Sequence, residues 1–255
     1  MARNLRSFAA FLAIFLTFLI HSSDASDREY DYSNNSPRGP QRWASLHRSW
    51  TLCSSGSLQS PINLTKETVL RDKTLHKLDS NYNSTAIATV LDWKEDVVLN
   101  FPDNAGDLMI NATQYKLVQI RVHSPSEHML EGKTFPAEVH LVHNSTDDSS
   151  RIAIVAFYFK LGRPNTFIGQ VIDALNSTQN LGELNPTLLK MVGRPYYRYS
   201  GSLTSPPCTE GVDWYVVKKN RRMSVDQFQF IHSYVNGSNA RPMQPANGRE
   251  IEAYK

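Results

Sequence analysis

Four of the eight histidines in the chain fall within one short stretch, residues 119–143, which reads QIRVHSPSEHMLEGKTFPAEVHLVH. His123 ends one alternating segment typical of a β-strand, and His140 lies within another. A turn signal at 131–133 separates the two segments. Antiparallel pairing of these strands would bring the two imidazoles together, as in a zinc site built on a rigid sheet. A catalytic zinc needs three protein ligands and an open position for water. By strand geometry the third ligand belongs two residues before His123, where the chain has Arg121.

The two strands must present these residues on matching faces, because side chains two positions apart share a face of a strand. We expect the odd-numbered residues of 115–123 to lie on one face of the first strand. In the second strand, the even-numbered residues of 138–142 should share one face and the odd-numbered residues of 139–143 the other. Arg121 and His123 are then same-face neighbours, and His143 points away from His140.

The rest of the chain is dominated by similar short alternating runs with turn signals between them, at residues 85–91, 96–101, 115–123, 137–143, 152–159 and 212–218. Helical patterns are scarce. The best are Pro164–Leu175 and Ser224–Val235, the second with Ser224 as N-cap. The sequence therefore predicts a β-rich α+β domain with a mainly antiparallel sheet and short peripheral helices.

Length and charge indicate one domain without a nucleic-acid partner, because 255 residues suit a single core and the net charge is only +3. Residues 1–25 have the pattern of a secretory signal peptide, with Arg3 and Arg6 before an apolar run and Ser23-Asp24-Ala25 at the cleavage site. The apolar run, residues 8–20, is shorter than the roughly 20 residues that span a bilayer, so we expect no membrane attachment after cleavage. Residues 26–40, rich in Asp, Asn, Ser and Pro, should form a mobile arm before a domain at 41–255.

A secretory route agrees with two further features of the sequence. The chain has an even number of cysteines, Cys53 and Cys208, which favours one disulfide in an oxidising compartment. N-glycosylation sequons begin at Asn34, Asn63, Asn83, Asn111, Asn144, Asn176 and Asn236. We expect Asn63 to be unused, since it lies between the apolar Ile62 and Leu64, and the other six to be candidate glycan sites.

Several motifs connect the chain to a known family. They are Gly39-Pro40 with Trp43, Gln59–Ile62, His123–His128, Ala137–His143, Tyr199–Cys208 and Arg241–Pro245. With these motifs in this order and spacing, the chain from about residue 39 onward resembles the α-class carbonic anhydrases, most closely the secreted plant-type branch. The resemblance implies an α-carbonic anhydrase fold on a large twisted central sheet, with zinc as cofactor at the floor of a conical cavity. It implies the reversible hydration of carbon dioxide to bicarbonate, since water bound to zinc ionises near neutral pH.

Residue by residue, the resemblance puts the three metal ligands on Arg121, His123 and His140. Thr204 takes the position that orients the zinc-bound hydroxide, and Glu127 the position that accepts the threonine proton. Gln119 and Glu138 fall on the positions that orient ligands from behind. The resemblance assigns the walls of the substrate cavity to Val142, Ile154, Leu203, Ser205, Val212 and Trp214, and the proton-shuttle position to Glu95.

Two of these positions depart from the family pattern. Arginine keeps its charge in proteins, so Arg121 cannot act as a ligand. At an effective dielectric of about 20 it would repel a divalent ion about 4 Å away by roughly 8 kcal/mol at most. Three arrangements are open: Arg121 binds an anion in the cavity, folds back onto Glu127 or another carboxylate, or is buried with a compensating partner. Glu95 titrates well below neutral pH and is a poorer proton relay than histidine.

The sequence leaves two hypotheses. One is a zinc carbonate dehydratase with weakened activity, using His123, His140 and a replacement ligand such as water. The other is a catalytically inactive, carbonic-anhydrase-like secreted glycoprotein with a binding or storage role, whose cavity holds bicarbonate or another small anion near Arg121. We favour little or no activity. Export from the cell is the expected destination, with the plastid, reached through the secretory route, as the alternative.

Overall fold

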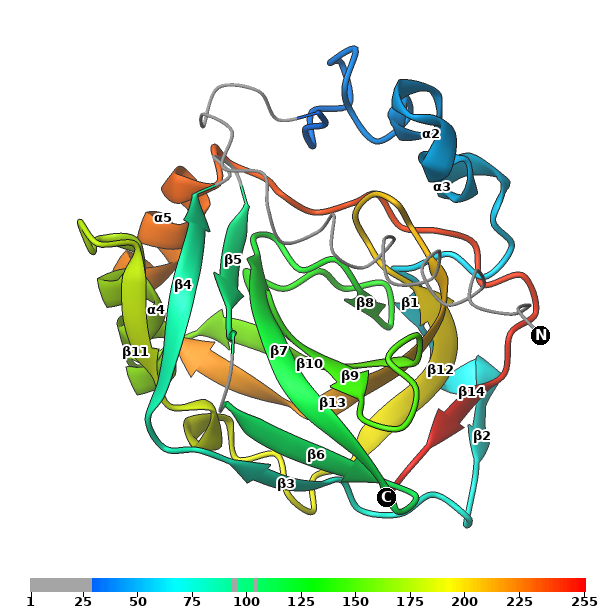
Figure 1. The fold of residues 1–255 in the computed structure, drawn as a ribbon. Coiled ribbons are helices and arrows are strands. Elements are labelled where there is room, and N and C mark those ends of the chain that lie inside the picture. The colour runs from blue at the N-terminus through cyan, green and yellow to red at the C-terminus, as the bar shows by residue number, and fades with distance from the viewer. Residues whose placement is uncertain (1–28, 93–95, 103–104) are drawn as a thin grey trace, which may run out of the picture.

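The computed structural model describes residues 29–92, 96–102 and 105–255, and within them most of the chain is built around one 12-stranded mixed sheet (Figure 1). The path across the sheet runs β11-β4-β5-β7-β9-β10-β13-β12-β14-β2, and β6 pairs with both β7 and β3. In chain order its strands are β2 (Val69–Arg71), β3 (Asp79–Tyr82), β4 (Ala86–Asp92), β5 (Val97–Asn100), β6 (Gly106–Ile110), β7 (Thr113–His123), β9 (Ala137–Ser145), β10 (Ile152–Leu161), β11 (Leu181–Leu184), β12 (Tyr196–Ser202), β13 (Glu210–Met223) and β14 (Ile251–Ala253). A separate parallel pair joins β1 (Asn63–Leu64) and β8 (Met129–Leu130). The predicted β-rich class is confirmed.

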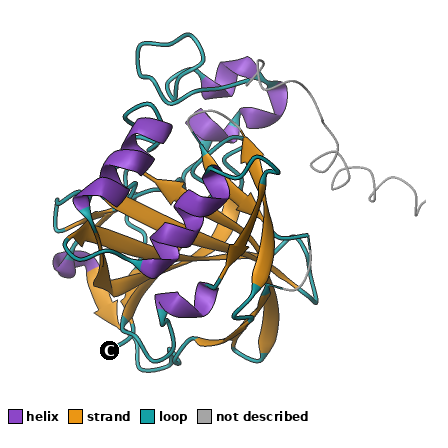
Figure 2. Cartoon of the chain, turned by 90° about the vertical axis from the view of Figure 1, so that its left-hand side faces the viewer, coloured by secondary structure: helices purple, strands orange, loops and turns teal. Residues whose placement is uncertain are grey.

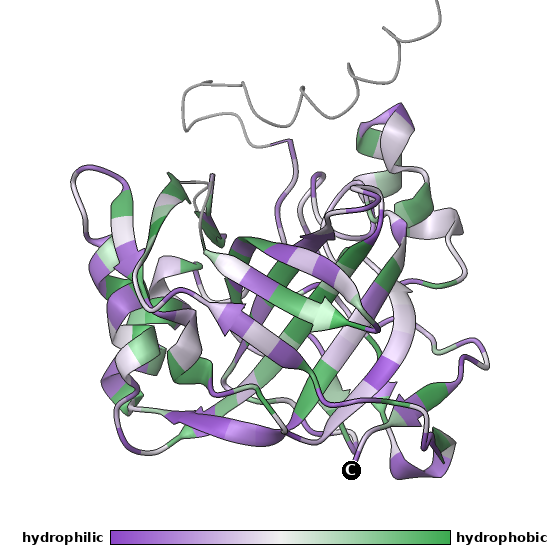
Figure 3. Cartoon of the chain, turned by 60° about the horizontal axis from the view of Figure 1, so that its bottom comes forward, coloured by the Kyte–Doolittle hydropathy of each residue, from purple (hydrophilic) through white to green (hydrophobic). Residues whose placement is uncertain are grey.

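Most neighbouring strands are antiparallel, as predicted, but β10 runs parallel to β13 and β14 parallel to β2. The central strands are buried on both sides. Eight of the nine residues of β9 are buried, and so are the seven central residues of β10. The polar and apolar residues that alternate along several outer strands are visible in Figure 3. The central strands therefore separate two layers of side chains.

The larger of these layers is covered by two helices, α4 (Thr166–Leu175) and α5 (Val225–Tyr234), which lie against the same face of the sheet (Figure 2). Asn165 caps α4, so the helix begins two residues after the predicted Pro164. Ser224 caps α5 in a capping box with Gln227, as the sequence suggested for Ser224. Both predicted helices are confirmed. The shorter helices are α2 (Trp43–Leu46), η1 (Arg48–Trp50), α3 (Leu52–Ser55), η2 (Lys66–Thr68) and η3 (Pro186–Leu189).

The segment before the sheet packs into a small aromatic cluster with α2 and α3 at one end of the molecule (Figure 1). Tyr32 and Trp43 are buried there, and the Trp43 indole donates a hydrogen bond to the carbonyl of Asp31. The described part of the predicted arm, residues 29–40, thus lies on the domain. The expected Cys53–Cys208 disulfide is present and ties this cluster to the loop before β13.

One detail of the predicted strand faces is wrong. The β7–β9 register shifts between Leu117 and Gln119, which marks a β-bulge. Tyr115 and Leu117 consequently lie in the large core with Ile120 and Val122, and do not share a face with the residues from 119 to 123 that point the other way. An inserted residue leaves no mark in an alternating pattern, so the sequence did not reveal it.

No described helix has the length and apolar character needed to cross a membrane. The predicted signal peptide, residues 1–25, lies outside the described residues.

Candidate functional site

The two histidines of the predicted metal site meet on neighbouring strands of the sheet. In the β7–β9 pair Arg121 lies opposite His140, and His123 lies opposite Glu138. The ring centres of His123 and His140 are 4.6 Å apart, and both side chains are buried. The antiparallel pairing that the sequence predicted thus brings the imidazoles together.

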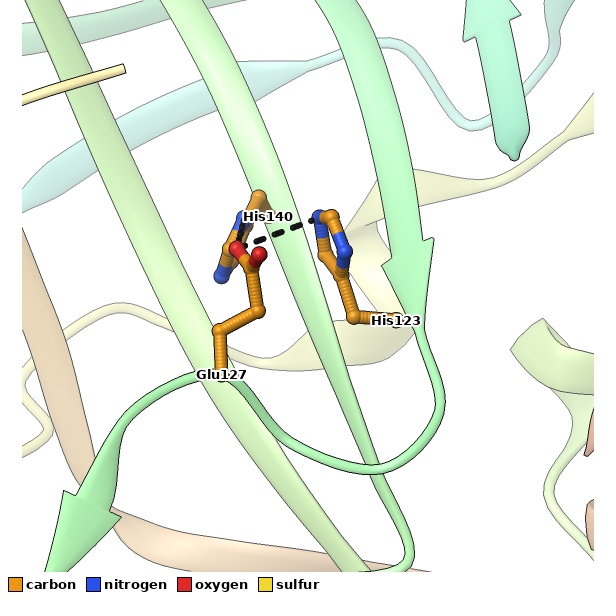
Figure 4. A group of neighbouring side chains, drawn as sticks. All are labelled: His123, Glu127 and His140. Carbon is orange, nitrogen blue, oxygen red and sulfur yellow. Dashed lines mark ion pairs between the residues drawn. The ribbon is translucent and has the colours of Figure 1, made fainter. Parts of the chain in front are cut away.

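Each ring is oriented by a hydrogen bond on its far nitrogen. Nδ1 of His123 donates to the carbonyl of Asn239 at 2.9 Å, and Nε2 of His140 donates to Oε1 of Glu138 at 2.8 Å. These bonds occupy the far nitrogen of each ring, and the other two nitrogens, His123 Nε2 and His140 Nδ1, are directed inward. Both face Oε2 of Glu127, at 3.5 Å and 3.8 Å (Figure 4).

Two atoms at the centre of this group have no hydrogen-bond partner among the described residues. They are His123 Nε2 and Glu127 Oε2, both buried, although an unsatisfied buried polar atom is costly. Two imidazole nitrogens and a carboxylate oxygen, all within 4.8 Å of one another, form a donor set that zinc accepts. These three residues therefore fit a divalent cation, whereas the neighbouring guanidinium of Arg121 opposes one.

Glu138 connects this group to a second buried network. Its Oε1 also accepts from Nδ1 of His128 at 2.7 Å, and Nε2 of His128 is bonded to the Tyr199 hydroxyl at 2.6 Å. Burial alone would raise the pKa of Glu138, but His128 and His140 hold that pKa far below its usual value. Burial lowers the pKa of His140, against the attraction of Glu138. Because His128 is buried and bonded on both nitrogens, its role is to support the site.

Arg121 turns toward polar neutral groups at the edge of the site. Its Nε donates to Oε1 of Gln119 at 2.7 Å, and its Nη1 donates to Oγ of Ser205 at 2.6 Å. It makes no ion pair with Glu127, so folding back onto that carboxylate, one of the three expected arrangements, is not what the structure shows. Burial would lower the pKa of Arg121, but the net shift is upward, with Asp96 the largest opposing influence, so the side chain stays cationic.

Thr204 is buried beside the site, but the hydrogen bond to Glu127 that the family resemblance implied is not formed. Oε1 of Glu127 instead accepts the backbone N–H of Arg241 at 2.9 Å, and Oε2 faces the imidazoles. The Glu127 carboxylate thus contacts Arg241 and the two imidazoles and makes no hydrogen bond to Thr204.

Most of the residues that the resemblance assigned to the cavity wall lie in one cluster. Residues Val142, Ile154, Val212 and Trp214 belong to one buried apolar cluster, with Leu203 packed against it, and Ser205 is the residue that receives Arg121. Glu95, the expected shuttle position, lies outside the described residues.

Asn239 is a positioning residue that the sequence did not reveal. Besides accepting from His123, it accepts the N–H of Ser124 through Oδ1 and donates through Nδ2 to the carbonyl of Val122. It lies 116 positions after His123, in a stretch without regular secondary structure. No periodicity connects such distant positions, so only the folded chain identifies its role.

The comparisons with known proteins agree with this arrangement. The model of the eukaryotic-type carbonic anhydrase family matches residues 38–255. Alpha carbonic anhydrase 7 of Arabidopsis thaliana is 38% identical over 97% of this chain and 95% of its own length. Dioscorin dioA3 of Dioscorea japonica is 39% identical over 88% of this chain and 85% of its own length.

Solved structures show the same relationship. A crystal structure of dioscorin complexed with ascorbate superimposes with a TM-score of 0.82 at 37% identity, covering 89% of this chain and 98% of that one. An α-carbonic anhydrase from Thermovibrio ammonificans, in complex with the inhibitor sulfanilamide, superimposes with a TM-score of 0.78 at 30% identity, covering 88% and 98%. On this evidence the chain belongs to the eukaryotic-type, or α-class, carbonic anhydrase family.

Proposed function

We propose that this protein binds a small anion at Arg121 and hydrates carbon dioxide weakly or not at all. The observation that carries the proposal is the cationic side chain of Arg121, which lies directly across from His140 where a third imidazole would be needed. A guanidinium cannot donate an electron pair to a metal, and its charge repels one. The same charge attracts an anion.

The N–H groups of Arg121 that remain free for a ligand support an anion. Two of its five N–H groups donate to Gln119 and Ser205, which leaves three that make no hydrogen bond to the described residues. A carboxylate or bicarbonate offers two oxygens that match the fork of a guanidinium. The similar dioscorin structure was solved with ascorbate, an acidic small molecule, and the sulfanilamide complex is another small-molecule complex on the same fold.

The second candidate function is weak zinc-dependent hydration, and Glu127 is the observation in its favour. With His123 and His140 it would complete a set of three donors for zinc. When bound, zinc would supply a Lewis acid that lowers the pKa of water. The chain's own contribution would be the orientation of both imidazoles by Glu138 and the Asn239 carbonyl, together with the apolar wall that keeps bulk water from the substrate.

We also propose that the protein enters the secretory pathway and carries N-linked glycans. The Cys53–Cys208 disulfide supports this, because such bonds persist in oxidising compartments. Four sequon asparagines have exposed side chains, as glycan attachment requires, and they are Asn34, Asn111, Asn176 and Asn236. Asn63 instead accepts the N–H of Gly132, which agrees with its expected lack of use.

The experiment combines zinc analysis, stopped-flow carbon dioxide hydration and calorimetric titration with bicarbonate and ascorbate on the secreted protein. We expect substoichiometric zinc, no sulfonamide-sensitive turnover, and anion binding that Arg121→Gln abolishes. The matched control is Arg151→Gln, which removes an exposed arginine at a distant strand end and should bind the anion normally. Stoichiometric zinc with sulfonamide-sensitive turnover would overturn the anion-binding proposal in favour of the enzyme.

A further inference from the structure

A second concave site lies away from the histidines, at the far end of β13. It has a volume of about 330 Å³, and six of its ten lining residues are cationic: Arg163, Lys190, Arg194, Lys219, Arg221 and Arg222. None of the ten is acidic. We call this set of six residues the cationic pocket.

The fold gathers these six residues from three separate segments: the β10–α4 connection, the η3–β12 connection and β13. Parallel pairing aligns the end of β10 with the end of β13, where Phe159 lies opposite Arg221. The chain leaves β10 through Arg163 into α4, while Lys190 follows η3 and Arg194 precedes β12. No local sequence pattern produces the cluster, which exists only because the long-range strand pairing is formed.

Arg221 is a half-buried lining residue of the cationic pocket and is held in place by hydrogen bonds to the backbone. Its guanidinium donates to the carbonyls of Leu189, Lys190 and Lys219 and lies over the ring of Phe157. Burial, followed by the charge of Arg194, lowers the pKa of Arg221 to about 10, so the side chain remains protonated at neutral pH. A fixed positive charge therefore lies in the same pocket as five other cationic side chains.

These charges have no counterion of their own within the described part of the chain. None of the six side chains takes part in an ion pair with a described carboxylate. Surfaces normally intersperse charges of both signs, because gathered like charges repel one another. Since the whole chain carries a net charge of only +3, the cluster is a local concentration.

We propose that the cationic pocket binds a compact organic polyphosphate. The guanidinium and ammonium groups match phosphate oxygens in charge and geometry. The volume of the pocket suits a small molecule, since ligand sites of about 300 Å³ and above hold one. A small scaffold with several phosphates would meet several of the side chains at once, whereas orthophosphate reaches few of them.

The cationic pocket is separate from the Arg121 site. His140 pairs with Ala156, which pairs with Val216, so these three residues lie level across the sheet. Arg221 is five residues further along β13, a rise of roughly 17 Å. Occupancy of one site therefore does not require the other, and this inference stands whether or not the proposed anion site at Arg121 is correct.

The test is isothermal titration calorimetry of the full secreted chain with inositol hexakisphosphate, with orthophosphate and a linear oligogalacturonate as comparison ligands. We expect saturable binding of inositol hexakisphosphate, with orthophosphate much weaker. The double variant Lys190→Gln/Arg222→Gln should weaken binding about tenfold, because two charge-assisted contacts are lost. Both side chains are exposed, so the fold should tolerate their replacement.

The matched control is Lys133→Gln/Arg48→Gln, which removes two exposed charges elsewhere and should leave the affinity unchanged. Hydrogen exchange on the unmodified chain gives a readout that does not depend on any variant. Binding should protect residues 188–194 and 219–222. Absence of binding, equal weakening in the control, protection confined to other segments, or preference for the oligogalacturonate would each overturn the proposal.

Discussion

The side chain at position 121 bears on both proposed functions, anion binding and zinc-dependent hydration. The neighbours that orient the imidazoles, Glu138 and the carbonyl of Asn239, are in place, and so is the carboxylate of Glu127. Arg121 itself is held to the side by Gln119 and Ser205. Among the described contacts of the two imidazoles, both orienting hydrogen bonds suit metal ligands, and Arg121 is the neighbour that opposes a cation.

A single reversal should therefore restore metal binding. We expect Arg121→His to raise zinc affinity by at least about 100-fold, because it adds a neutral nitrogen donor and removes a positive charge. Zinc titration with a competing chelator measures the effect, and slow hydration should accompany it. The exposed Arg151→His serves as the control and should gain no tight zinc. If Arg121→His folds but binds no zinc, the pocket has changed in more than this residue.

The buried His143 should make stability depend on pH. Its pKa is lowered from 6.5 to about 4 by burial, with Nδ1 bonded to the Ala153 carbonyl and Nε2 to the Tyr82 hydroxyl. Since the unfolded chain binds this proton more readily, stability is intact above pH 6.5 and is lost as the pH falls toward 4. The contribution lost between pH 7.5 and pH 5 is about 2 kcal/mol.

Urea unfolding at both pH values measures that dependence. His143→Gln should unfold more easily at pH 7.5 but lose about 2 kcal/mol less than the parent on acidification. His47→Gln replaces an exposed histidine, so it should lose as much stability on acidification as the parent does. An undiminished loss in His143→Gln would assign the acid sensitivity to other groups.

At the residue scale, the sequence predicted what strand alternation and family motifs report. That included the meeting of His123 with His140 and the buried apolar wall. It did not predict that Arg121 would bond to Ser205, 84 positions away, or that Glu127 would face the imidazoles and not Thr204. Side-chain direction depends on competing partners that only the folded chain brings near.

At the scale of elements, the segment between α5 and β14 has no regular secondary structure. Its residues nevertheless bond to loops that are distant in the sequence. Arg241 donates its backbone N–H to Glu127, and its buried guanidinium donates to Gln59, to the Ser60 carbonyl and to the Cys53 carbonyl. Burial lowers the pKa of Arg241 to about 10, so it is charged at neutral pH. The Arg241 residue thus connects the loops around the site to one another.

Arg241→Ala should cost about 3–4 kcal/mol, because several buried acceptors lose their donor together. Urea unfolding at neutral pH measures the loss. Arg48→Ala, an exposed arginine on η1, should change stability by less than about 0.5 kcal/mol. A loss below about 1 kcal/mol in Arg241→Ala would mean that water replaces the guanidinium at these carbonyls.

Element prediction succeeded where a pattern was long and failed where it was short or interrupted. The strands β7, β9 and β10 and both long helices were recognised, since their periodicity covers many residues. Short strands at or near the edges of the sheet, such as β2, β11 and β14, have three or four residues, too few to show a period. The bulge in β7 changed the face of its first half without any sequence signal.

For the whole molecule, the disulfide is the covalent link between the aromatic cluster and the sheet. Cys53 and Cys208 are 155 positions apart, and closing a loop of that length restricts the unfolded chain by about 5 kcal/mol in the chain-entropy model. We expect reduction, or Cys53→Ser/Cys208→Ser, to lower the free energy of unfolding by several kcal/mol. Denaturant unfolding with and without reductant measures it. A loss under about 1 kcal/mol would contradict the chain-entropy account.

The fold class, the single sheet and its covering helices followed from composition, strand patterns and family motifs. The order of strands across the sheet did not, because pairing partners are chosen by burial over the whole chain. The parallel pairs of β10 with β13 and of β14 with β2 are examples, since neither joins strands that are adjacent in sequence.

The pairing of β14 with β2 also predicts which parts of the sheet fold first. Ile251 lies opposite Val69, so this contact closes a loop of about 180 residues, whereas the β9–β10 hairpin closes one of about eight. The entropy of closure differs by about 3 kcal/mol in favour of the hairpin. The centre of the sheet, which contains His140, should therefore assemble early, and the β12–β14–β2 border late. Until that border forms, the edge of β12 is open to pairing with other chains. The risk of aggregation should therefore be greatest before β14 and β2 have paired.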